Sequence, residues 1–136
     1  MKILFNCSTN IKGGSIQTAT NFILEAIKDY SIEWHFALSR SIANQLEKFN
    51  IKPKNLFIFD ISPARSNSAR KQLLSIEKEI APDVVYTMSG PAYIKFRSFH
   101  VLGCSNAFIT HAEFSIFMHF GILNGMLELA RIVYLN

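Results

Sequence analysis

The stretch MKILFNCSTNIKGGSIQTATNFILEAI, residues 1–27, joins an apolar run to a loop with two adjacent glycines and then to an amphipathic segment. Residues 2–7 predict a buried strand because the run is short and apolar. Residues 15–30 predict a helix, with Ser15 capping its first turn. Its apolar residues recur at the spacing of one helical face: Ile16, Ala19, Phe22, Ile23, Ala26, Ile27 and Tyr30. A strand, a glycine loop and a helix in this order are the typical start of an α/β fold.

The chain continues this alternation up to residue 105. Helices are predicted over residues 40–49 and 68–81, and strands over residues 33–39, 55–61, 83–88 and 98–105. This pattern indicates a Rossmann-like, doubly wound, mainly parallel sheet with helices on both faces. The 136 residues, 49% of them hydrophobic, suffice for one domain with its own core. We expect that domain over residues 1–109. An apolar helical tail over residues 110–136 would belong to the same domain or act as a docking segment.

Cysteine content and charge limit the class of protein. The two cysteines, Cys7 and Cys104, make no disulfide framework, which fits a reduced cytoplasmic compartment. No apolar run reaches the roughly 18 residues that span a bilayer. Seven basic residues face two acidic ones between residues 40 and 71. This excess is either a solvated face, or a surface that favours phosphate-bearing ligands or peripheral contact with the inner membrane surface.

The two adjacent glycines lie where a doubly wound sheet binds its ligands. The ligand crevice is at the carboxyl ends of the strands, where the strand order reverses, and the loop after the first strand borders it. Gly13 and Gly14 let a ligand approach the backbone, and the N–H groups of the next helix favour an anion. Gly13, Gly14 and Ser15 are therefore either a phosphate-facing turn or a simple turn device. The loop has neither the dinucleotide-binding glycine spacing nor a Walker lysine.

Three stretches of the sequence carry a resemblance to a known family. In chain order they are MKILFNCSTNIKGGSIQTATNFI (1–23), IAPDVVYTMSGPAY (80–93) and HVLGCSNAF (100–108). Together they resemble the N-terminal half of family 4-type (group 1) glycosyltransferases of the GT-B fold. In that family two Rossmann-like domains face each other across a cleft, and the N-terminal one mainly receives the acceptor. The resemblance implies that Gly13 and Gly14 line the cleft and that Ser89 and Gly90 lie on its rim.

The resemblance also implies an activity. This is glycosyl transfer from a nucleotide-sugar donor, a substrate rather than a cofactor, to a saccharide or lipid-linked acceptor. In the family a C-terminal domain holds most of the donor and supplies a pair of glutamates, and nothing in residues 1–136 resembles it. We therefore expect this chain alone to be inactive and to need a donor domain, either as a continuation of the gene or as a partner chain.

Candidate chemical residues are few. Family members commonly carry a histidine near the exit of the fourth or fifth strand. The matching exits here have none, so His111 and Glu113 are the nearest candidates for catalysis. Lys95 and Arg97, in the loop after Gly90, are candidates to meet an anionic acceptor, or they are solvated loop charges. The histidines and cysteines lack metal-ligand spacing, so no metal is expected. The aromatic residues fall at core positions and not between basic ones, which argues against nucleic-acid binding.

Two other functions stay open. The first is a non-catalytic α/β module that binds a partner through the apolar segment 114–133. The second is a flavodoxin-like binding protein, for which the stretch STNIKGGSIQT (8–18) supplies only part of a phosphate loop. Binding of a nucleotide sugar would separate a glycosyltransferase domain from the non-catalytic module. A yellow protein that releases flavin on denaturation would support the flavodoxin-like alternative.

Overall fold

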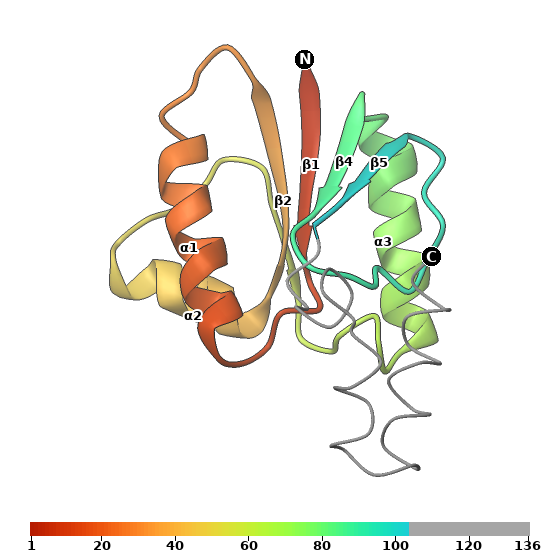
Figure 1. Ribbon diagram of the computed structural model, residues 1–136, viewed down its shortest axis with the longest axis horizontal. Helices are drawn as coiled ribbons and strands as arrows, with labels where there is room; N and C mark the ends of the chain where they lie inside the picture. The colour runs from red at the N-terminus through yellow and green to blue at the C-terminus, as the bar shows by residue number, and fades with distance from the viewer. Residues whose placement is uncertain (104–136) are drawn as a thin grey trace, which may run out of the picture. The chain divides into compact units, whose positions relative to one another are not determined.

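The computed structural model describes residues 1–103, which form a doubly wound α/β unit as predicted (Figure 1). Its five strands are all parallel and lie in the order β3-β2-β1-β4-β5. The predicted tail, the predicted boundary at residue 109, and both His111 and Glu113 lie outside the described residues. Along the chain the elements are β1 (Lys2–Cys7), α1 (Gly14–Ala26), β2 (Glu33–Ser39), α2 (Arg40–Lys48), β3 (Leu56–Phe59), α3 (Asn67–Ile80), β4 (Val84–Thr87) and β5 (Phe99–Leu102).

Helices cover both faces of the sheet, with α1 and α2 on one side and α3 on the other (Figure 1). The chain moves outward from β1 to β3 and then crosses to β4 on the far side of β1. Because crossovers between parallel strands are right-handed, this change of direction moves the connecting helix to the opposite face. The strand order therefore reverses between β1 and β4, which makes their carboxyl ends the topological switch point.

Strand β1 is buried on both sides, which explains its continuous apolar run. Leu4 belongs to the core under α3, and Phe5 belongs to the core under α1 and α2. The ring of Phe5 stacks on that of Phe22 with centroids 4.4 Å apart, and its centroid lies 5.5 Å from that of Tyr86. Residues far apart in the sequence thus share one aromatic cluster around the central strand.

Helix α1 ends at Ala26, so the prediction that it extends to Tyr30 is wrong. Tyr30, placed on the inward face of that helix by its spacing, is 94% exposed. The Asp29 carboxylate accepts hydrogen bonds from the backbone N–H of Ser31 at 2.9 Å and from its hydroxyl at 2.6 Å. These bonds lower the pKa of Asp29. They form a turn where the helix would otherwise continue, because hydrogen bonds from an Asp side chain to the nearby backbone compete with helical hydrogen bonds.

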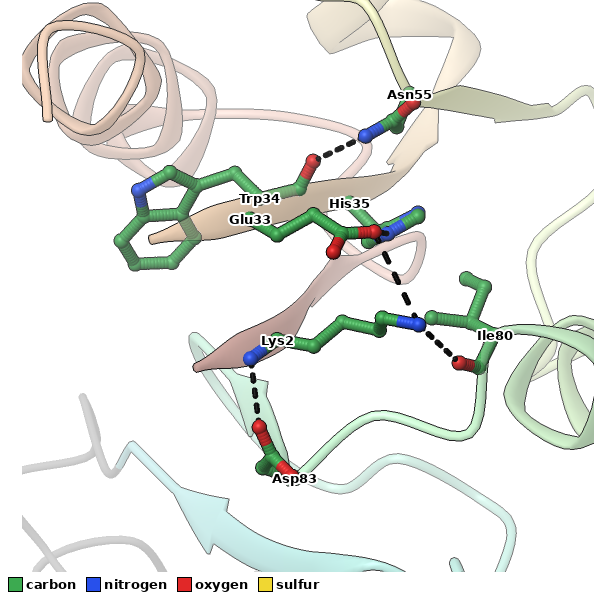
Figure 2. Close-up of polar contacts among 7 residues, drawn as sticks. All are labelled: Lys2, Glu33, Trp34, His35, Asn55, Ile80 and Asp83. Carbon is green, nitrogen blue, oxygen red and sulfur yellow. Dashed lines mark hydrogen bonds and ion pairs between the residues drawn. The ribbon is translucent and has the colours of Figure 1, made fainter. Parts of the chain in front are cut away.

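The amino edge of the sheet is held together by Lys2 (Figure 2). Its backbone N–H donates to Asp83 Oδ2 at 2.7 Å, and its Nζ donates to the Ile80 carbonyl at 3.1 Å. The same Nζ lies 3.9 Å from Glu33 Oε1, which His35 Nε2 approaches to 2.9 Å. The hydrogen bond with His35 is the main cause that lowers the pKa of Glu33. These contacts tie β1 to β2 and to the end of α3, a structural role at the edge opposite the switch point.

Within residues 1–103, no helix is both long and apolar enough to cross a membrane.

Candidate functional site at the switch point

The loop between β1 and α1, residues 8–13, is anchored on two sides, by the junction of β2 with α2 and by the segment after β4. Ser39 Oγ donates to the Asn10 carbonyl, and Ser41 Oγ donates to the Ile11 carbonyl at 3.1 Å. On the other side Asn10 Nδ2 donates to Ser89 Oγ, just after β4. The loop is therefore tied to the start of α2 and to the exit of β4. Such pre-organisation lowers the entropy that a binding site loses when a ligand arrives.

Helix α1 starts at Gly14, so the prediction that Ser15 starts and caps the helix is wrong. Gly13 is the N-cap, with φ of 70°, and no side chain of the described region caps the turn. Ser15 Oγ instead donates to the Lys12 carbonyl at 2.8 Å. A Cβ placed on Gly13 or on Gly14 would have no neighbouring atom within 4 Å. The backbone is thus approachable from the side on which side chains would stand, next to N–H groups that attract anions.

The two glycines should respond differently to alanine. Gly13 has φ 70° and ψ −159°, a region essentially reserved for glycine, so Gly13→Ala should cost about 1–3 kcal/mol of unfolding free energy. Gly14 has helical geometry and open space, so Gly14→Ala should leave stability unchanged or raise it by up to about 1 kcal/mol. Urea unfolding of both variants tests this, and equal losses would contradict the geometry of the turn.

The basic residues between 40 and 71 are divided between the two edges of the sheet. Four lie towards the carboxyl edge, at the start of α2, in the turn before α3 and in the first turns of α3: Arg40, Arg65, Arg70 and Lys71. Three lie at the amino edge, at the end of α2 and in the loop before β3: Lys48, Lys52 and Lys54. At the carboxyl edge Arg40 Nε donates to Asp60 Oδ1 at 2.7 Å. This contact raises the pKa of Arg40 and lowers that of Asp60. Asp60 thus opposes one of the four basic residues, and basic residues still outnumber acidic ones at the carboxyl edge among residues 40–71.

A chain of buried polar side chains runs behind the loop. The backbone N–H and hydroxyl of Ser8 both donate to Asn6 Oδ1, at 3.2 and 2.7 Å. Asn6 Nδ2 donates to Thr87 Oγ1 at 3.1 Å, and Thr87 Oγ1 lies 2.9 Å from His100 Nε2. Ser8, Asn6 and Thr87 are fully buried, and burial lowers the pKa of His100. These hydrogen bonds were not predicted from the sequence, although polar residues inside the predicted core strands were a signal for them.

The structure links Ser89 to the glycine loop through the hydrogen bond from Asn10 Nδ2 to Ser89 Oγ. Gly90 packs against the end of β5, because a Cβ on it would lie 2.8 Å from the Leu102 side chain. Lys95 and Arg97 are both exposed and lie on the segment that returns to the start of β5. Arg97, two residues before β5, is therefore at the amino edge, away from Gly13.

The thiol and metal chemistry of the described region is limited. Cys7 is fully buried, and burial raises its pKa well above the ordinary value, which makes the thiolate scarce. No three His, Cys, Asp or Glu side chains of residues 1–103 are grouped to hold a metal ion. The groups that the described region brings together at the switch point are hydroxyls, an amide and backbone N–H groups. These bind and orient ligands, but they do not exchange protons readily near neutral pH.

Comparison of the chain with protein-family models, with characterised proteins and with solved structures finds no match. The resemblance to glycosyltransferases accordingly stays a prediction from the three sequence stretches. A doubly wound sheet hosts many unrelated functions, so a function must be argued from the switch-point residues and not from the fold.

Proposed function

We propose that residues 1–103 belong to the acceptor-side domain of a glycosyltransferase that moves a sugar from a nucleotide-sugar donor to a saccharide or lipid-linked acceptor. The observation that carries this proposal is the Gly13–Gly14 turn. It lies at the switch point, has no side-chain cap among the described residues, and leaves its backbone approachable. A turn of this kind suits a diphosphate, whose charge is stabilised by the N–H groups and dipole of α1.

The proposal assigns this chain a binding role. Asn10, Ser89 and the first turn of α1 would orient the donor phosphates and the acceptor hydroxyl. Most contacts to the base, ribose and sugar would come from a donor domain. That domain would also exclude water, without which hydrolysis competes with transfer. The chain alone would then bind nucleotide sugars weakly and have no transferase activity.

Ligand titration of the full ¹⁵N-labelled chain tests the binding role. Adding UDP or UDP-glucose should shift the amide signals of Gly13, Gly14 and Ser15, with dissociation constants on the order of millimolar for a site without its second domain. Gly14→Glu should abolish these shifts because it fills the open space and repels phosphate. Asn21→Glu adds the same charge on an exposed position of α1 and is the matched control. Shifts confined to other residues, or unaffected by Gly14→Glu, would count against the proposal.

Translation of the gene downstream of the Asn136 codon, in all three frames, tests the catalytic part. A second Rossmann-like pattern with two spaced glutamates would support the proposal, and Gly14→Glu in that complete enzyme should abolish activity. Unrelated sequence would direct the search to a separate donor-domain chain or to the non-catalytic alternative.

A further inference from the structure

We propose that His100 is a protonation-sensitive positioning residue which, through Thr87 and Asn6, holds Ser8 and the start of the β1–α1 loop in place. The inference goes beyond the proposed transferase role and does not depend on it. It rests on the hydrogen-bond chain that links β5, β4 and β1 to the first residue of the loop.

The directions of the hydrogen bonds follow from counting donors. Ser8 presents two donors, its N–H and its hydroxyl, to Asn6 Oδ1, so the Nδ2 of the Asn6 amide must face Thr87. Thr87 Oγ1 accepts from Nδ2, and the acceptor that the described residues offer to its own hydrogen is His100 Nε2 at 2.9 Å. If Nε2 carried a proton, Thr87 Oγ1 would accept twice and its buried hydrogen would have no acceptor among these residues. A nitrogen that accepts carries no proton. These hydrogen bonds therefore favour the neutral form of His100 with its hydrogen on Nδ1.

Protonation of His100 disrupts this arrangement of donors and acceptors. Nε2 becomes a donor, and the Thr87 hydroxyl hydrogen loses its acceptor inside a fully buried site. One outcome is an unsatisfied buried hydroxyl, which is costly. The other is rotation of the Asn6 amide, so that Oδ1 accepts from Thr87 and Ser8 loses the acceptor of both its donors. The first outcome leaves Ser8 bound to Asn6 but carries the cost of the unsatisfied hydroxyl, which favours the second outcome. In the second outcome the charge on His100 removes the hold on Ser8.

The surroundings of His100 set the direction of its titration. Among residues 1–103 the charged group that acts on His100 is Glu77 of α3, which raises the pKa, but burial is the larger cause and lowers the pKa below the ordinary 6.5. Neighbouring β4 presents Val85 and Thr87, and the returning segment presents Phe96, whose ring centroid is 4.8 Å away. His100 is thus neutral at pH 7. Acidification below pH 6.5 should release the loop and also lower stability, because the unfolded chain binds more protons in that range.

A pH titration of the full chain by NMR tests the coupling. Between pH 8 and pH 5 the imidazole of His100 and the backbone amide of Ser8 should titrate with the same apparent pKa, below 6.5. His100→Gln places an amide group near the position of Nε2 that can accept a hydrogen bond but does not titrate. In this variant the Ser8 amide should lose that transition and keep its neutral-pH position.

Thr87 variants separate coupling from mere proximity. In Thr87→Ser the hydroxyl remains, so Ser8 should still titrate with His100. In Thr87→Val the hydroxyl that links them is removed, so His100 should titrate while the chemical shift of the Ser8 amide does not change with pH. A Ser8 amide that is flat in the unaltered chain while His100 titrates, or one that titrates equally in Thr87→Val, would overturn the proposal.

Discussion

Replacing Phe5 with alanine is expected to lower the free energy of unfolding by about 3–5 kcal/mol. Phe5 is fully buried in the central strand, and its ring contacts those of Phe22, Phe36 and Tyr86. Removing it leaves a cavity bounded by β2, β4 and α1 at once, which backbone relaxation cannot fill. Since a domain is stable by only about 5–15 kcal/mol, this single change should remove a large fraction of the stability of the domain.

Urea unfolding followed by circular dichroism measures this loss. Phe49→Ala is the matched control, because Phe49 is 51% exposed at the end of α2 and should lose about 1 kcal/mol or less. A loss for Phe5→Ala as small as that of the control would mean that the aromatic cluster is not the main core of this face.

Replacing Glu77 with alanine should lower the free energy of unfolding by about 3–6 kcal/mol, because it removes two hydrogen bonds to a charged group, each of which contributes about 1.5–3 kcal/mol. Glu77 is 4% exposed on α3, and its Oε1 accepts from the backbone N–H groups of Arg97 and Ser98 at 2.6 and 2.9 Å. This carboxylate holds the segment that leads into β5. Its loss leaves two backbone donors without their partner and frees the edge strand.

Two variants make this test specific. Glu79→Ala removes the same side chain from an exposed position of the same helix and should change stability by less than about 0.5 kcal/mol. Glu77→Gln keeps an acceptor oxygen without the charge and should give an intermediate loss. Hydrogen exchange should show that Glu77→Ala increases the exchange of the Arg97 and Ser98 amides most. Equal losses for Glu77→Ala and Glu79→Ala would contradict the role of the carboxylate.

The elements of this fold were readable from local pattern. The boundaries of β1 and β2 were predicted as observed, because short apolar or alternating runs are bounded by polar loops. The end of α1 was not, because the spacing of Ile27 and Tyr30 continues the helical face while Asp29 and Ser31 close a turn. Helical spacing shows only which residues could share a face. The end of the helix depends on the hydrogen bonds between Asp29 and Ser31, which compete with helical ones.

The candidate site was predictable only in part. The position of Gly13 and Gly14 at the ligand edge followed from a general rule of doubly wound sheets. Arg97 was grouped with them because it follows Gly90 closely in the sequence, yet the return of the chain to the start of β5 carries it to the opposite edge. The connection between two parallel strands must return from the carboxyl edge to the amino edge. Residues close together along such a connection can therefore lie at opposite edges of the sheet.

Sequence alone thus determined the fold class, the order of the elements and the place of the glycine turn, because these depend on periodicity and on residues close together in the chain. Tertiary structure alone decided which polar groups meet. Asn6 and Thr87 are separated by 81 positions, and they pair because the strand order makes β4 the neighbour of β1. Asn10 finds Ser89 for the same reason. Buried hydrogen bonds between distant residues depend on strand order and register, which no local pattern specifies.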